Sequence, residues 1–404
     1  MSPTMPLSKV KLGDCLTLLT DYHANGSYKS LKENVTLLDD QNYAVMIRTT
    51  NFEKDDFDKD LKYISEHAYN YLTKSKVYPG DILMNKIATP GSVYRMPNLN
   101  RPVSLAMNLF LLRTDETCLN QTYAYYWLKA NESYVKSFAC GAATATITKK
   151  AVRELDLQLP DIQIQKKIAG ILLTYEELII NAQQRIRILE SMARTLYRKA
   201  IKSCAPALTT KPIVNSGYWR FISENVSAYP GTKRYYATAD VDCLSITGPG
   251  IEYPFREKPS RAQKQPTPCS VWFARMKDTY KIAWYGASDQ ERATGSMLSS
   301  GFAGFEACSP DLWPLLFLTV SSKEFHAQKD LYCTGATQMS ITNEGLGRIE
   351  MPLPDEETAK RLGREAGPLL NSILILQKQS DVLRRTRDLL LPRLISGQIN
   401  VEAV

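Results

Sequence analysis

The feature that most constrains this chain is an internal repeat with an offset of 194 residues. Residues 141–148 align without gaps on residues 335–342, and Leu-Pro-Asp at 159–161 aligns on Leu-Pro-Asp at 353–355. Seven of the 21 aligned positions are identical, and the glycine and proline among them restrict the backbone. The period is far longer than the roughly 20 to 50 residues of solenoid units. The repeat predicts a duplicated domain, each copy followed by its own connector.

A long helical pattern follows each Leu-Pro-Asp. Apolar residues recur at spacings of three and four over residues 164–200, with one extra four, and again over residues 362–394. This rhythm predicts two coiled-coil helices, each roughly 60 Å long at 1.5 Å per residue. We expect the two helices to bury each other, and the alternative is that each lies on its own domain. The predicted seam includes Ile168, Ile171, Leu178, Leu189, Leu196, Leu369, Ile373, Leu376, Leu383 and Leu390.

The segments before the helices have the mixed pattern of α/β domains. Residues 77–84 predict a turn and a buried strand, with a counterpart at 268–273, and residues 108–113 predict another strand. Helices are predicted over 122–136 and from Ser309, where a serine N-cap precedes a proline. The tyrosines and tryptophan of 123–127 are able to stack on bases but are expected in the core.

The predicted fold class is mixed α/β, with two globular domains related by the repeat. A stretch with two prolines and small polar residues at 203–216 is typical of a linker. The predicted boundaries are 1–160 for the first domain, 161–203 for the central helix, 204–354 for the second domain and 355–404 for the last helix.

Composition excludes several classes of protein. The chain is 44% hydrophobic and 23% charged, which is the ordinary globular proportion. No apolar stretch approaches the roughly 20 residues of a membrane helix, and the first residues lack the pattern of a secretory signal. The eight cysteines are scattered without pairing rhythm. We therefore expect a cytoplasmic protein with reduced thiols and no membrane partner.

The excess positive charge is concentrated on one helix. The net charge is +8, and residues 165–202 alone carry eight basic and three acidic side chains. The basic residues of the second half of this helix either form a solvated face or contact a partner or phosphates, and both interpretations stay open. They include Arg185, Arg187, Arg194, Arg198 and Lys199.

The motifs of common enzymes are missing from the sequence. There is no Asn- or Asp-Pro-Pro-aromatic motif of an adenine methyltransferase, no phosphate-binding loop, no Pro-Asp with Glu-x-Lys of a nuclease and no nucleophile elbow. The three histidines are not spaced with cysteines for zinc. We expect a chain without catalysis, cofactor or metal.

A family resemblance is carried by the opening of the first long helix. Residues 159–169, Leu-Pro-Asp-Ile-Gln-Ile-Gln-Lys-Lys-Ile-Ala, resemble the Leu-Pro-Pro-Leu-Glu-Glu-Gln-Lys-Arg-Ile-Ala signature of specificity (S) subunits of type I restriction-modification systems. Residues 390–399 are similar to the C-terminus of that family, and Gly-Asp-Ile-Leu at 80–83 and residues 141–148 resemble its target-recognition domains. The resemblance covers essentially the whole chain. It departs at Asp161 and Ile164, and Ala359 stands where Gln165 does in the first copy.

The resemblance implies a DNA-reading subunit in which each domain reads one half of a bipartite, gapped site of double-stranded DNA. Antiparallel helices then set the spacing and dock two methyltransferase (M) subunits, with Gln165 among the docking residues. Whether restriction or translocase (R) subunits also bind is left open. Two alternatives are kept: the specificity chain of a type IIB-like system, which differs in its partner, and a coiled-coil scaffold that binds proteins instead of DNA.

Base reading requires Arg, Lys, Asn and Gln side chains, while phosphate contacts position the protein. Residues 254–281 hold seven basic side chains against Glu257 and Asp278, and they are the best candidate DNA-facing surface, with a solvated loop as the alternative. The repeated Gly-rich segment either touches DNA or packs, and the acidic run at 53–60 should face away from phosphates. The candidate DNA contacts are Lys86, Arg95, Asn98, Arg101, Thr144, Thr146, Arg256, Arg261, Lys264, Gln265, Arg275, Lys277, Lys281 and Gln338.

Overall fold

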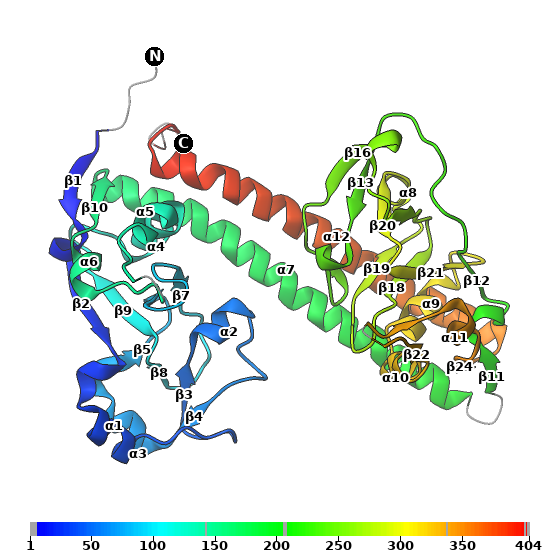
Figure 1. Ribbon diagram of the computed structural model, residues 1–404, viewed down its shortest axis with the longest axis horizontal. Coiled ribbons are helices and arrows are strands. Elements are labelled where there is room, and N and C mark those ends of the chain that lie inside the picture. The colour runs from blue at the N-terminus through cyan, green and yellow to red at the C-terminus, as the bar shows by residue number, and fades with distance from the viewer. Residues whose placement is uncertain (1–5, 142–143, 205–207, 337, 400, 402–404) are drawn as a thin grey trace. The chain divides into compact units, whose positions relative to one another are not determined.

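The computed structural model describes residues 6–141, 144–204, 208–336, 338–399 and 401. The chain divides into two compact units (Figure 1), residues 1–178 with 383–404 as unit 1 and residues 179–382 as unit 2. Each unit holds one globular domain and parts of two long helices, α7 (Ile162–Ser203) and α12 (Glu356–Ile395). The predicted mixed α/β class with two long helices is confirmed.

The domain of unit 1 is built on two four-stranded sheets. One is antiparallel throughout, with the order β2 (Leu16–Asp21), β9 (Leu109–Thr114), β6 (Ile82–Asn85) and β7 (Val93–Arg95). The other has the order β4 (Tyr63–Ile64), β3 (Ala44–Ile47), β8 (Val103–Leu105) and β5 (Lys76–Val77), and only β3 and β8 in it run parallel. A separate ribbon pairs β1 (Ser8–Lys11) with β10 (Asp156–Leu159), directly before α7.

The domain of unit 2 repeats this plan strand for strand. Its antiparallel sheet has the order β12 (Trp219–Phe221), β21 (Phe302–Ala307), β18 (Ser270–Ala274) and β19 (Ile282–Tyr285). Its mixed sheet has the order β16 (Ile251–Pro254), β13 (Thr232–Tyr236), β20 (Ser296–Ser299) and β17 (Ala262–Lys264), again with one parallel pair in the centre. The ribbon of β11 (Thr209–Pro212) and β24 (Glu350–Leu353) precedes α12. The internal repeat is therefore a repeat of topology.

Shorter elements complete each domain. In unit 1 these are α1 (Tyr28–Asn34), α2 (Thr49–Glu53), α3 (Glu66–Tyr71), α4 (Gln121–Ala130), α5 (Glu132–Lys136) and α6 (Lys149–Arg153). In unit 2 these are α8 (Gln290–Thr294), α9 (Trp313–Val320), α10 (Lys323–Leu331), α11 (Asn343–Gly347) and the short strands β14 (Val241–Asp242), β15 (Ser245–Ile246), β22 (Cys333–Thr334) and β23 (Ser340–Ile341).

Strands β6 and β18 are the buried centres of the two antiparallel sheets. All four residues of β6 and all five of β18 are buried, because helices and the second sheet cover both faces. The turn before β6 forms as predicted, with Gly80 at φ +87° and the Tyr78 amide donating to Asp81 Oδ2 at 2.7 Å. Beside β18, Gly304 leaves room for the ring of Trp272, which lies 2.4 Å from where a Cβ would stand.

Three local predictions need correction. The helix expected over 122–136 is divided at Asn131 into α4 and α5, and Asn120 caps α4 by accepting from the Tyr123 amide at 3.0 Å. The helix expected from Ser309 begins at Trp313, because Pro314 takes the first-turn position and Ser309 only closes a turn to Leu312. Part of the predicted linker is strand β11, since its backbone pairs with β24.

The two long helices bury each other in an antiparallel manner. In unit 1, Ile164 and Ile168 near the start of α7 share a core with Leu394 and Ile395 at the end of α12. In unit 2 the relation is reversed: the second half of α7 packs against the first half of α12, with Ala193, Ala359, Leu362, Ala366 and Ile373 in one core. Five residues of the predicted seam pack against these cores, namely Ile171, Leu189, Leu196, Leu369 and Leu390. A sixth, Leu376, is buried.

Two residues of the predicted seam and docking set have an exposure opposite to the predicted one. Leu178 is 50% exposed, because the seam passes through Ile179 and Ala182, which are 5% exposed each. Gln165 is 1% exposed and cannot meet a partner. Its side chain accepts from the Asn120 amide at 3.0 Å and donates to the carbonyls of Cys118 and Pro160, which fastens the first turn of α7 to the domain. No helix in the described part of the chain has the length and apolar character needed to span a membrane.

Candidate nucleic-acid interface

The same four loops meet at one end of each domain, and we call this meeting point the loop junction. In unit 1, the Lys86 amide donates to the Asn108 carbonyl at 2.9 Å, and the Ile147 amide donates to the Lys86 carbonyl at 3.0 Å. In unit 2, the Arg275 amide donates to the Gly301 carbonyl at 2.8 Å, and the Ile341 amide donates to the Arg275 carbonyl at 2.9 Å. The junction comprises residues 48–50, 86–89, 106–108 and 144–147 in unit 1, and residues 237–240, 275–278, 300–301 and 338–341 in unit 2.

The repeated Gly-rich segment is thus a wall of the junction. Thr146 pairs with Cys140 and bridges to Ile87, while Ser340 bridges to Met276, so the backbone packs in both copies. Thr144 and Gln338 nevertheless stay exposed. The segment therefore packs through its backbone and presents side chains at the same time. Residues 142, 143 and 337 of the repeat lie outside the described residues.

Lys86, predicted to contact DNA, is buried in the first junction. Its ammonium lies 3.2 Å from Asp21 and 5.4 Å from the centre of the Phe110 ring, and the residue is 9% exposed. Asp21 also pairs with Lys149 at 2.9 Å. Burial alone would raise the pKa of Asp21, but the hydrogen bond from Lys149 and the charge of Lys86 outweigh burial and lower that pKa. Both cations are thus engaged within the domain, and Asp21 compensates one of their two charges.

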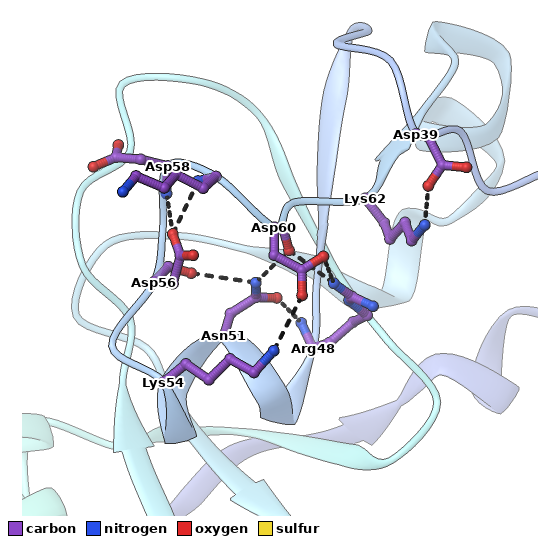
Figure 2. Close-up of polar contacts among 9 residues, drawn as sticks. Asp39, Arg48, Asn51, Lys54, Asp56, Asp58, Asp60 and Lys62 are labelled. Carbon is purple, nitrogen blue, oxygen red and sulfur yellow. Dashed lines mark hydrogen bonds and ion pairs between the residues drawn. The ribbon is translucent and has the colours of Figure 1, made fainter. Parts of the chain in front are cut away.

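An acidic loop lies beside the same junction. Helix α2 begins at Thr49, whose hydroxyl donates to Asn85 Oδ1 at 2.8 Å, and the acidic run of residues 53–60 follows this helix. Figure 2 shows Asp60 accepting from Arg48 and Lys54, at 3.2 and 3.5 Å. Asp60 thereby holds Arg48, which directly follows β3. That the acidic run faces away from DNA stays a prediction. Carboxylates compensate part of the positive charge beside the first junction.

The exposed side chains of the first junction are uncharged. Met107 is 51% exposed and Ile87 is 36% exposed. Beside them lies a cavity of about 400 Å³ lined mainly by apolar and aromatic residues, among them Tyr22, Tyr28 and Leu31, with Asn108 at its edge. Apolar side chains at such a place suit the methyl group of thymine, and amides suit base edges.

Arg275 occupies in the second junction the place of Lys86 in the first, and it too is engaged. Its guanidinium donates to the Ile341 carbonyl at 3.0 Å and to Asn343 Oδ1 at 2.7 Å, and burial lowers its pKa. Arg275 therefore holds the Gly-rich wall in place. This explains why a basic residue follows the central strand in both copies without contributing a free charge.

Side chains of α10 hold residues 276–281, in the loop between β18 and β19, in place. Lys329 is fully buried, and its ammonium donates to the carbonyls of Met276 at 2.7 Å and Thr279 at 3.1 Å. Asp330 accepts from the Asp278 amide at 3.0 Å. From α7, Arg194 donates to the Tyr280 hydroxyl at 3.1 Å. The corresponding loop of unit 1 is held by α5, where Glu132 accepts from Ser92 at 2.6 Å.

Free donors remain at the second junction. Arg261 and Gln338 are exposed. The Gln338 amide contacts the sulfur of Met276 at 3.4 Å, and the Lys277 ammonium contacts the sulfur of Met339 at 3.9 Å. Lys264 and Lys281 are partly committed, to Asn225 at 3.1 Å and to the Thr238 carbonyl at 2.9 Å. Gln265 is wholly committed to Lys233 and to the carbonyls of Pro266, Ala293 and Ser296, so its predicted DNA contact is replaced by a structural role. Arg256 is exposed on the segment between β16 and β17.

Three residues predicted for the first domain lie away from its junction. Arg95 ends β7, opposite Ile82 at the start of β6, and lies 4.0 Å from Glu176 of α7. Asn98 and Arg101 are exposed on the loop between β7 and β8, and Arg101 lies over the ring of Tyr63 at 5.8 Å. Because β7 runs antiparallel to β6, the loop after β7 is at the opposite end of the domain from Lys86.

Sequence reasoning missed the groups that shape the junctions. Lys329, Asn108 and Asp21 carry no motif, and their partners are backbone groups or side chains far away in the chain. One usable signal existed, since a basic residue follows the buried strand in both copies, at 86 and 275. The offset there is 189 residues instead of 194, which hides it from an ungapped comparison.

Comparisons with known proteins agree on one family. Residues 8–191 match the family model described as type I restriction modification DNA specificity domain. The type I restriction enzyme MjaVIII specificity subunit of Methanocaldococcus jannaschii is 22% identical over 318 residues, 74% of this chain and 75% of the relative. The putative type I restriction enzyme MjaX specificity subunit of that organism is 22% identical over 381 residues, which are 88% of this chain and 87% of the relative. The S subunit of a type I restriction-modification system from M. genitalium shares the fold, with a TM-score of 0.61 and 14% sequence identity. The match covers 98% of this chain and 97% of that subunit.

A duplicated α/β domain, a loop junction in each copy and two antiparallel helices define the class of two-domain specificity proteins. The matched domain model and the curated relatives narrow this class further. Residues 8–191 are a type I restriction modification DNA specificity domain, and the chain as a whole is similar to the specificity subunits of type I restriction-modification systems.

Proposed function

We propose that this chain is the non-catalytic DNA-reading subunit of its complex, with each loop junction facing one half of a bipartite, gapped site. One observation carries the proposal: the two junctions share their backbone hydrogen bonds but present different side chains. Asn108 and Thr144 in the first junction correspond to Gly301 and Gln338 in the second. A monomer that reads two different half-sites needs the same geometry with different side chains, because base edges are read by side chains.

The two junctions would read DNA in different ways. In the second, Lys277 supplies a phosphate contact, and Arg261 and Gln338 face base edges. In the first, Asp21 and Asp60 compensate part of the nearby positive charge. Exposed Met107, Asn108 and Thr144 read the groove there with less electrostatic attraction. Since phosphate neutralisation supplies most non-specific affinity, the chain alone binds DNA weakly, and partner subunits complete the clamp.

The helices act as spacer and as the surface for two methyltransferase subunits. The seam residues Ile168, Ile373 and Leu376 are buried between the helices. Partner contacts therefore use the exposed faces of α7 and α12, where Ile180, Ile188 and Leu389 are 50 to 64% exposed.

A modified-base map of the genome tests this function. A host carrying this gene and the adjacent methyltransferase gene is compared with the same host lacking only this gene. We expect a gapped two-part motif to lose its methyl-adenine when the gene is removed. An unchanged map would show that the chain does not direct methylation. The identity of the neighbouring gene separates a type I system from a type IIB-like one.

A further inference from the structure

A stripe of basic side chains runs along one face of the second half of α7. Arg187, Arg194, Arg198 and Lys202 recur at helical spacings of seven, four and four, and Ser191 lies between the first two. Residues at such spacings share one face of a helix. The stripe is thus a property of one helix face, whereas Arg185 and Lys199 project elsewhere.

The stripe forms one wall of a groove in unit 2. Helix α10 contributes Lys323 from the other side, and the groove has a volume of about 660 Å³. Its apolar lining includes Tyr197, Ile201 and Leu318. Five basic residues thus line a groove that holds only two acidic ones, Glu190 and Glu324.

No ion pair joins any of these five cations to a carboxylate in the part of the chain that the structure describes. A cation-rich surface of this kind complements an anionic partner. The apolar lining distinguishes between anionic partners, because a DNA backbone has no apolar face to bury. An amphipathic protein segment has one, and apolar burial supplies most of the free energy of such docking.

The groove breaks the repeat symmetry of the chain. At an offset of 194, the positions of Arg187 and Arg194 fall on Asp381 and Asp388 of α12, and those of Arg198 and Lys202 fall on Pro392 and Ser396. Glu190 and Ser191 of the groove fall on Arg384 and Arg385. The corresponding face of α12 therefore carries no net charge. An acidic segment that fits the groove would find no net electrostatic attraction at the equivalent place.

We propose that this groove binds one acidic, amphipathic segment of a partner subunit, and that each chain binds only one. The inference rests on the proposed function, which supplies the partner subunits. Two identical methyltransferase subunits would meet repeated surfaces on the helices, but only one of them would engage the groove. The groove thus makes the two sides of the complex unequal.

Site-specific photo-crosslinking in the reconstituted complex tests the proposal. Photoreactive p-benzoylphenylalanine replaces Ser191 in the full chain, which is assembled with the adjacent-gene methyltransferase, any adjacent-gene restriction subunit and a DNA duplex. Leu331, which is 73% exposed at the end of α10 and does not line the groove, is the matched control position. We expect Ser191 to capture one protein segment per chain, with net negative charge and an apolar face, as identified by mass spectrometry.

Charge reversal supplies the second arm. Arg198→Glu with Lys202→Glu should reduce this crosslink about tenfold, as expected when charge pairs at an interface are lost. Arg185→Glu with Lys199→Glu makes the same change of charge on the same helix outside the groove and should leave the crosslink unchanged. Four outcomes would overturn the proposal: capture of DNA, equal capture from the Leu331 position, equal loss in both variants, or no capture. The modified-base map reports on the proposed function separately, since it does not depend on the crosslink.

Discussion

The buried ammonium of Lys329 donates a 2.7 Å hydrogen bond to the carbonyl oxygen of Met276. This contact ties helix α10 to the first residue of the loop 276–281. A second hydrogen bond, to the Thr279 carbonyl at 3.1 Å, holds the same loop three residues further on. A charged group buried in this way orders backbone that has no strand partner of its own. The loop is therefore held in shape before any ligand arrives.

Lys329→Met should destabilise the second domain and disturb its junction. The substitution removes the donor to the carbonyls of Met276 and Thr279 and the ion pair with Asp330. Losing hydrogen bonds from a charged group costs about 1 to 3 kcal/mol. Chemical denaturation should show the loss of stability, and Lys323→Met, an exposed position on the same helix, should show almost none. A stable Lys329→Met variant with unchanged methylation of both half-sites would contradict the positioning role.

Arg261→Ala should weaken reading at one half-site only. Its guanidinium is exposed at the second junction, so its loss removes a phosphate or base contact without changing the fold, with a cost of about 1 to 3 kcal/mol for a base contact. Methylation of substrates with changes in either half-site measures the effect. Arg275→Ala is the contrasting variant, because it should destabilise the Gly-rich wall. Equal loss at both half-sites from Arg261→Ala would exclude its assignment to the second junction.

Asp21→Asn should destabilise the first domain at neutral pH. The pKa of Asp21 is lowered in the folded protein by Lys149 and Lys86 in spite of burial. The stabilising contribution is therefore complete above the unfolded pKa of about 3.9 and disappears as the pH falls through the lower folded pKa. Unfolding curves of wild type and variant should differ at pH 7 and converge in strong acid. A constant difference at all pH values would show that Asp21 acts without its charge.

His326 should make the second domain less stable in mild acid. Burial, with the charge of Lys329, lowers the pKa of its imidazole to about 4. Between this value and the ordinary pKa of about 6.5, only the unfolded chain binds the proton, so stability falls as the pH decreases through this window. His326→Phe should flatten the pH dependence of the unfolding free energy between pH 4 and 6.5. The same slope in both proteins would assign the effect to other groups.

Gly304→Ala should cost on the order of 1 to 3 kcal/mol. A Cβ at this position would lie 2.4 Å from two atoms of the Trp272 ring, which is fully buried and cannot move aside. Gly170→Ala is the matched control on α7, where nothing lies within 4 Å of the added methyl group, and it should stabilise the helix by about 0.5 to 1 kcal/mol. Thermal unfolding of the two variants should therefore shift in opposite directions.

The sequence by itself determined the architecture, because that information is local or periodic. The repeat predicted two copies of one domain, and the recurrence of Ile168, Ala182 and Ala193 predicted a helix that buries one face. Local turn chemistry at Gly80 and Asp81 placed the buried strand that follows. Even here the one-residue shift of the seam from Leu178 to Ile179 depended on how the two helices pack.

Only the tertiary structure decided which basic side chains are free to meet DNA. Lys86, Arg275 and Arg261 look alike in the sequence, but Lys86 meets Asp21 and Arg275 meets the Ile341 carbonyl. Arg261 is exposed, and among the described residues it has neither a carboxylate nor a carbonyl partner. Whether a long cationic side chain is neutralised depends on acceptors brought close by folding, 65 or 66 residues away along the chain in the first two cases. Composition and spacing do not carry that information, because a buried charge is stabilised by partners from separate elements.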